Sequence, residues 1–219
     1  EAMSKAGVRM VCIGYESPSA EDLKAMHKGL TPQKMVEWTL ALRRYFWVHG
    51  MFIFGYPNKE PSALSVPEMV RRYKTFIRDA RISSIQVLHP VPLVGTELRE
   101  RLERDGRIFP LDVAPWSKYD GSFACFQPNN MSIAELQETP IQLMKWFYSS
   151  WSFWRIPYRT LVFPFHYLLA GWHNWHDGWY RDIVKYGGHR LLVRWQRRQK
   201  GVDYVAMLNA AMHEREKPP

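Results

Sequence analysis

Hydrophobic and polar positions in the first half of the chain form a repeating pattern. Three apolar runs of strand length occupy residues 8–13, 51–54 and 85–88. Each run is followed by a longer segment with apolar side chains at three- and four-residue spacing, which predicts a helix with one buried face. Strands that alternate with helices through short loops favour right-handed crossovers and a parallel sheet. The pattern therefore predicts the α/β fold class, with three βα units.

Helix-start signals precede the amphipathic segments. Residue types that cap helix N-termini occur at Ser19, Thr31, Ser65 and Thr96. The helix after Thr31 is expected to bury one stripe of apolar side chains and to end at Gly50. The stripe consists of Met35, Trp38, Leu42 and Phe46.

The first six residues have the character of a helix end. Gly7 follows where a helix C-cap belongs, and the first strand begins at Val8. Because a domain rarely starts with a helix end that leads into an interior strand, we expect further βα units upstream of Glu1.

The pattern changes after about residue 107. Proline and glycine interrupt the next stretch, which contains one expected strand at Ser122–Phe126. A capping box at Ser132 begins a long helix, and the chain to about residue 213 is predicted to be helical. Breaks in these helices are expected at Pro157, Pro164 and Gly187-Gly188. We therefore predict two parts, residues 1–107 with the βα units and a helical, Trp-rich, basic extension at 108–219.

Charge is unevenly distributed along the chain, whose formal net charge is +9. Residues 140–219 contain 12 Lys/Arg and 5 Asp/Glu, whereas residues 1–139 contain 18 and 16. A basic segment of this kind fits a solvated helix face. It also fits contact with nucleic acid or with an anionic membrane surface. The sequence leaves these three interpretations open.

Cysteine content and hydropathy restrict the class of protein. With only Cys12 and Cys125, the chain has no disulfide framework and no zinc-binding spacing. Cys12 lies in the first predicted strand, where we expect a small core residue. The sequence shows no signal-peptide pattern and no apolar run of transmembrane length. These features favour a reducing, cytoplasmic setting.

Polar or turn motifs follow each of the three predicted strands. They are Gly14-Tyr15-Glu16-Ser17, Gly55-Tyr56-Pro57 and the segment 89–96, which begins with His89-Pro90. Because the carboxyl ends of parallel strands share one edge of the sheet, these loops should meet there. Glu16, Gly55 and His89 are the residues expected to share one pocket.

The chemistry of Glu16 suits a nucleoside ligand. A carboxylate at a strand end can accept two hydrogen bonds from the vicinal hydroxyls of a ribose, and Ser17 could add another. The structural alternative is that Glu16 only helps to start the helix capped by Ser19. For His89, a capping or hydrogen-bonding role is the alternative to a place in the pocket.

The order of these motifs resembles the radical S-adenosylmethionine (SAM) family, in particular its cobalamin-binding subgroup. The resemblance covers about residues 1–107 and includes Leu23 and Lys28 in addition to the motifs. It implies the C-terminal half of a TIM-like barrel, which is a partial barrel of three parallel βα units, followed by a mostly helical extension.

The resemblance also implies SAM as the cofactor. The Glu-Ser pair after the first strand would face the ribose, and the second strand with its glycine turn would pack on the adenine. The residues that the resemblance places at the cofactor are Glu16, Ser17, Lys28, Phe54, Gly55 and His89.

The implied activity is that of an Fe–S oxidoreductase that cleaves SAM reductively, for radical chemistry or methyl transfer. The family holds a 4Fe–4S cluster with a three-cysteine loop, which two isolated cysteines cannot provide. The cluster, and cobalamin if it is used, would be bound upstream, so the chain is expected to be inactive alone and to ligate no metal. The alternative function is a non-catalytic basic module that binds nucleic acid or a membrane surface.

The resemblance further predicts how the chain associates. Its substrate would be a small molecule that the sequence does not identify. Three strands cannot close a barrel, so we expect an open sheet edge and an uncovered apolar face. A homodimer through that edge, or a cover formed by the Trp-rich tail, would bury the face. The side chains expected on it are Val11, Ile13, Phe52, Phe54, Ile85 and Val87.

Overall fold

The computed structural model describes residues 1–58, 64–198 and 203–215, and it shows a mixed α/β protein. Its sheet has three parallel strands in the order β1-β2-β3. The strands are β1 (Met10–Glu16), β2 (Trp47–Ile53) and β3 (Ser84–Leu88). The predicted parallel sheet is confirmed. Such a sheet also occurs in Rossmann-like folds, and the described residues show no closed or half-closed barrel.

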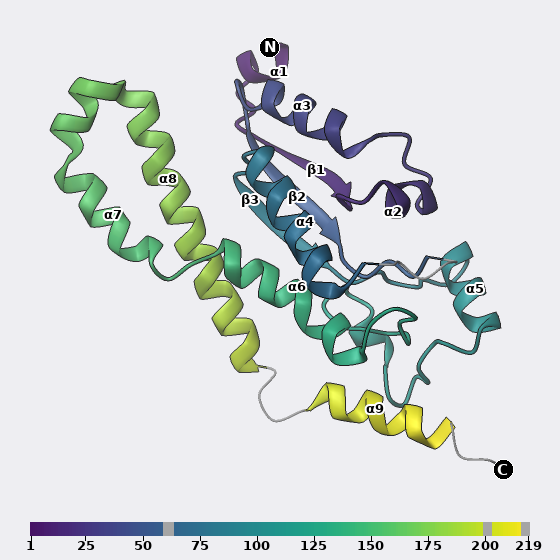
Figure 1. Ribbon diagram of the computed structural model, residues 1–219. Coiled ribbons are helices and arrows are strands. Elements are labelled where there is room, and N and C mark those ends of the chain that lie inside the picture. The colour runs from purple at the N-terminus through teal and green to yellow at the C-terminus, as the bar shows by residue number, and fades with distance from the viewer. Residues whose placement is uncertain (59–63, 199–202, 216–219) are drawn as a thin grey trace.

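Two crossover helices cover one face of the sheet, as Figure 1 shows. They are α3 (Pro32–Leu42) and α4 (Val66–Asp79). Phe52 lies at the centre of this layer, where its ring packs edge-on against Phe76 of α4 at a centroid distance of 5.9 Å. The core side chains of this layer include Val48, Phe52, Ile85, Val87, Tyr73 and Ile77.

The expectation of an uncovered apolar face is therefore wrong, because α3 and α4 bury that face. Strand residues alternate between the two faces of a sheet. Cys12 pairs in register with His49 on the other face, next to the half-exposed Met10. Cys12 is exposed there, so the expectation that it is a core residue is also wrong.

The second strand begins four residues earlier than predicted, and α3 ends earlier. The Trp47 N–H donates to the Arg9 carbonyl at 2.8 Å, which brings this segment into the sheet. Gly50 lies inside β2 rather than at a helix end, and Trp38 is exposed instead of buried in a stripe. Aromatic and β-branched residues follow Phe46, and their pairing with β1 overrides the helical spacing.

Helix-start predictions are confirmed at each predicted cap. Ser19 caps α2 (Ala20–Ala25), Thr31 caps α3, and Thr96 caps α5 (Glu97–Arg104). Capping boxes begin α4 and α6 (Ile133–Phe147), as their Ser-x-x-Glu sequences predict. At the start of the chain, α1 (Ala2–Lys5) is followed by a glycine with a left-handed φ of 93°.

A second core cluster lies between α5, α6 and α9 (Tyr204–Arg215). The strand expected at residues 122–126 is absent from the described residues. Only a single bridge, Ile108 to Phe126, and a short 3-10 helix η1 (Trp116–Lys118) occur in this region. Side chains bond to the Ala124 backbone instead: its N–H donates to Gln137, and Tyr204 donates to its carbonyl, both at 2.8 Å. The division of the chain at residue 107 stays a prediction.

Tyr148, just after α6, closes the outer edge of β3. Its hydroxyl accepts a hydrogen bond from the Ile85 N–H at 2.8 Å and donates to the Ile85 carbonyl at 2.6 Å. Both outward-facing backbone groups of this edge residue are thus satisfied away from water. The outer edge of β1, by contrast, pairs with no strand among the described residues.

We expect Tyr148→Phe to lower the free energy of unfolding by about 1–2 kcal/mol, because the buried Ile85 N–H loses its partner. Chemical denaturation followed by circular dichroism measures this change. Tyr158→Phe is the matched control, since Tyr158 is exposed, and it should change stability by less than about 0.5 kcal/mol. Equal losses in the two variants would show that the hydroxyl does not seal the edge.

A long helical hairpin extends away from the sheet (Figure 1). It consists of α7 (Ser152–Leu161) and α8 (Phe163–Arg198). The break predicted at Pro164 lies close to their junction, but Pro157 is inside α7 and the Gly187-Gly188 pair is inside α8. α8 bends instead at Gly171, whose φ is 76°. In the described part of the chain, no helix has the length and apolar character needed to cross a membrane.

Candidate functional site

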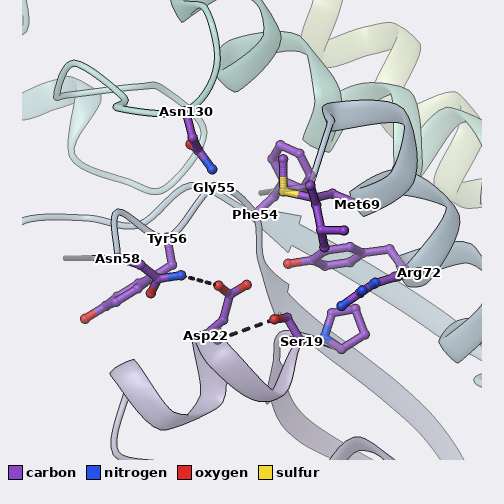
Figure 2. A pocket seen from close by; sticks show the side chains of 12 residues that line it. Ser19, Asp22, Phe54, Gly55, Tyr56, Asn58, Met69, Arg72 and Asn130 are labelled. Atoms are coloured by element: carbon purple, nitrogen blue, oxygen red, sulfur yellow. Dashed lines mark hydrogen bonds between the residues drawn. The ribbon is translucent and has the colours of Figure 1, made fainter. Parts of the chain in front are cut away.

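A pocket lies at the carboxyl edge of the sheet, where β1 and β2 end. It has about 410 Å³ of empty volume, including its open mouth. The loop after β1, helix α2, the end of β2 and helix α4 supply its walls, as Figure 2 shows. Its polar lining consists of Ser19, Asp22, Asn58, Arg72, Tyr73 and Asn130, and its apolar lining includes Phe54, Tyr56 and Met69.

Asp22 is the central charged group of this pocket. Its carboxylate accepts a hydrogen bond from the Ser17 hydroxyl at 2.6 Å and another from the Asn58 amide at 2.7 Å. The cap at Ser19 fixes the start of α2 and thereby the position of Asp22. Burial raises the pKa of Asp22, and the two hydrogen bonds offset part of that rise. Asp22 is thus a positioned carboxylate with little hydration.

Asn58 and Tyr73 extend the same polar network. The Asn58 Oδ1 atom is buried without a hydrogen-bond partner among the described residues. Such an acceptor is costly unless a ligand or water satisfies it. The Tyr73 hydroxyl donates to the Ile53 carbonyl at 2.5 Å and lies 3.4 Å from the Ser17 hydroxyl. Burial raises the pKa of Tyr73, so its phenol stays neutral.

Glu16 lies beside this network at the end of β1. Its φ of 62° is left-handed, and the register of β1 and β2 shifts between Gly14 and Glu16. This bulge turns the carboxylate back over Gly14, where Lys28 Nζ lies 3.1 Å from Glu16 Oε1. Lys28 Nζ also donates to the Gly14 carbonyl at 3.3 Å. Bulges of this kind redirect a side chain next to functional sites.

The predicted site residues divide into three groups in the structure. Phe54 and Gly55 line the pocket, and Gly55 has a φ of 77° with Leu136 packed where a Cβ would lie. Ser17 is fully buried beneath the pocket and bonds Asp22. Glu16 and Lys28 form their ion pair at the same sheet edge but are not part of the pocket lining. The role of these residues in cofactor binding stays a prediction.

His89 follows β3 and lies outside the pocket lining. Its Nδ1 is 3.0 Å from the Gly121 carbonyl, and its Nε2 is 3.0 Å from the Leu136 carbonyl. Burial lowers the pKa of His89 against the opposing effect of these backbone hydrogen bonds. The imidazole therefore connects the end of β3 to α6. This is the hydrogen-bonding alternative considered for it, and the expectation that Glu16, Gly55 and His89 share one pocket is wrong.

Four pocket residues were not predicted as site residues: Asp22, Asn58, Arg72 and Tyr73. Asp22 is read most simply as an acidic residue in the first turn of a capped helix. Asn58 is the first polar residue after the Gly55-Tyr56-Pro57 turn, which was a usable signal. Arg72 and Tyr73 lie within an amphipathic helix, where sequence alone gives no reason to separate them from ordinary surface and core residues.

Comparisons with known proteins give two partial matches. The chain is 26% identical over 147 residues to a bacteriochlorophyllide d C-12(1)-methyltransferase of Chlorobaculum tepidum, covering 66% of this chain and 30% of that protein. It is 28% identical over 121 residues to an uncharacterized methyltransferase of Pyrococcus horikoshii, covering 54% of this chain and 24% of that protein. The matches thus span less than a third of the length of these curated relatives. No family model matches the chain.

These matches correct the function implied by the motif resemblance. Both relatives are named methyltransferases, so the assignment to the radical SAM family and the implied reductive cleavage of SAM are wrong. The expectations of an iron–sulfur cluster and of cobalamin lose their support with that assignment. In the described part of the chain, no three His, Cys, Asp or Glu side chains are grouped in a way that could hold a metal ion. The alternative of a non-catalytic basic module gains no support from the relatives.

Proposed function

We propose that this chain forms part of a SAM-dependent methyltransferase and that SAM binds at the carboxyl edge of the sheet. The methyltransferase names of both relatives support the reaction class. The observation that carries the location is the buried, pre-positioned Asp22 in a pocket that also exposes Arg72. When bound, SAM supplies an electrophilic methyl group on a sulfonium centre.

The pocket suits the amino-acid end of SAM. An α-amino acid carries an ammonium and a carboxylate close together, and the pocket presents Asp22 and Arg72 as groups of opposite charge. Ser17 and Asn58 each use one oxygen of Asp22, and a carboxylate has about four acceptor sites in all. An ammonium can therefore be added without breaking the network. The unpaired Asn58 Oδ1 offers a second acceptor in the same place.

Glu16 suits the ribose of the same ligand. Its carboxyl group is partly exposed at the strand end, and the bulge fixes its direction. Vicinal hydroxyls donate to a carboxylate in this position in dinucleotide-binding folds. Lys28 then holds Glu16 in its ionised form through the ion pair at Oε1. The buried Ser17 acts through Asp22 and does not contact the ligand.

For the fold, we propose that the three βα units belong to a larger parallel sheet of the TIM-like kind expected from the sequence. The support is that β1 has one strand partner in the described residues and that its outer edge is free to pair. A bound ligand at the carboxyl edge is consistent with this arrangement, because that edge carries the loops.

We expect Glu16→Gln to weaken SAM binding about tenfold, since a neutral amide accepts weaker hydrogen bonds than a carboxylate does. Equilibrium dialysis of the purified full-length protein with labelled SAM measures the affinity. Glu37→Gln removes the same charge from an exposed site on α3 and should bind within about twofold of the wild type. A wild-type protein that does not bind SAM, or equal affinities in the two variants, would refute the assignment of Glu16.

A further inference from the structure

The α7–α8 hairpin carries an exposed stripe of large apolar and aromatic side chains. They follow one another at three- and four-residue spacing, which places them on one helix face along α7 and into the first turns of α8. The last four members expose between 72% and 88% of their surface. We call this set the exposed stripe: Trp151, Trp154, Tyr158, Leu161, Phe165, Leu168 and Leu169.

The exposed stripe is not the face with which α7 packs on α8. That packing uses Arg159, whose Nε donates to the buried Asp182 carboxylate at 2.6 Å. Arg155 lies 3.7 Å from the other oxygen of Asp182, and the Trp175 indole donates to the Arg159 carbonyl at 2.9 Å. These contacts fix the rotation of α7, so the stripe faces away from its own partner helix.

The tip of the hairpin combines an uncharged sequence with an ordered interior. Residues 160–176 contain no Asp, Glu, Lys or Arg. Phe163 anchors the tip by packing edge-on against Trp175 at a centroid distance of 4.6 Å. Figure 1 shows this end of the hairpin projecting from the rest of the protein, where a flat surface can reach it. Apolar patches of this size on a soluble surface mark interaction sites.

Basic side chains accompany the stripe along the hairpin. Residues 149–198 contain eight Lys/Arg and two Asp. Asp182 is consumed by its two arginine partners, and the C-terminal half of α8 exposes Arg190, Arg194 and Arg197. The surface that meets this hairpin should therefore be apolar at the contact and anionic around it. The polar headgroups and acyl chains of an anionic bilayer have this arrangement.

We propose that the exposed stripe inserts into the interface of an anionic lipid membrane, with the basic side chains of α8 at the headgroups. A nucleic-acid site would place its cations in the contact itself, whereas here the contact is uncharged and the cations lie behind it. Tryptophan and tyrosine in the stripe suit the headgroup level, because their rings combine an apolar body with a polar atom. This proposal concerns a docking surface and does not rest on the proposed function.

Flotation with two kinds of vesicle tests the proposal on the full-length protein. Vesicles of phosphatidylcholine mixed with phosphatidylglycerol should carry the protein upward, and vesicles of phosphatidylcholine alone should carry less. The double variant Leu168→Asp/Leu169→Asp should reduce partitioning at least about tenfold, since both side chains would be buried in the membrane. The matched control is Leu93→Asp/Val94→Asp, an exposed adjacent pair that receives the same charge.

The outcomes separate the membrane from other occupants. Retained partitioning in the control variant together with loss in the stripe variant supports the proposal. Equal loss in both variants would attribute binding to net charge and overturn it. Absence of vesicle binding by the wild-type protein would also overturn it. Light scattering on the same samples addresses a second copy: a dimer that the stripe variant dissociates, without vesicle binding, would assign the stripe to self-association.

Discussion

Asp22→Asn is expected to weaken SAM binding roughly 10- to 100-fold, the range associated with losing a charge-assisted hydrogen bond in a buried site. The side-chain shape is kept, so the effect should come from the lost charge. Asp22 is buried between Ser17 and Asn58, and water can compensate for its charge only poorly. Equilibrium dialysis or calorimetric titration with SAM measures the change.

Glu21→Gln is the matched control for this variant. Glu21 precedes Asp22 on α2, is exposed and loses the same charge, so its affinity should stay within about twofold of the wild type. Circular dichroism should show the same helix content in both variants. If Asp22→Asn binds SAM as tightly as Glu21→Gln does, Asp22 is not part of the binding site.

Asp182→Asn should lower the free energy of unfolding by about 2–3 kcal/mol, because it leaves Arg159 without its buried carboxylate partner. The Arg155 contact adds little to this figure, since that side chain is half exposed. Urea denaturation monitored by circular dichroism measures the loss. Hydrogen exchange should locate it in α7, because Asp182 fixes α7 against α8.

Asp177→Asn provides the comparison, since Asp177 lies on the same helix and is exposed. Its stability should stay within about 0.5 kcal/mol of the wild type. Equal stabilities for the two variants would mean that the Asp182 ion pairs do not hold the hairpin together. The exposed stripe would then lack the fixed orientation on which its proposed membrane contact depends.

Local signals explain which parts of the fold were predictable. A helix cap involves residues within one turn, so Ser19, Thr31 and the Ser132 capping box gave correct helix starts. The three strands were found because buried parallel strands are continuous apolar runs. The start of β2 was missed because it depends on pairing with Arg9, a contact that the local spacing of Met35, Leu42 and Phe46 does not reveal.

Glycine and proline misled the prediction of the C-terminal helices. Gly188 was read as a break, but the Tyr148 ring occupies the place where its Cβ would lie. Glycine is there for a close approach between α8 and the end of α6. Pro157 was read as a break as well, yet α7 continues through it. In both cases a contact between helices decides the outcome, and one sequence does not show it.

The candidate site was predictable only in its location. The rule that parallel strands present their loops at one edge found Phe54 and Gly55. It could not find the hydrogen bond between Asp22 and Asn58, which are 36 residues apart in the sequence. His89 shows the opposite limit, since its position at a strand end was right but both ring nitrogens face backbone carbonyls.

Hydrogen–deuterium exchange with and without saturating SAM tests the central claim most directly, because it reports both binding and its location. The account predicts slower exchange at the carboxyl edge of the sheet, in residues 16–22 and 54–58, and unchanged exchange in the hairpin tip at 161–169. Protection confined to segments away from this edge, or no protection anywhere at saturating SAM, would contradict it.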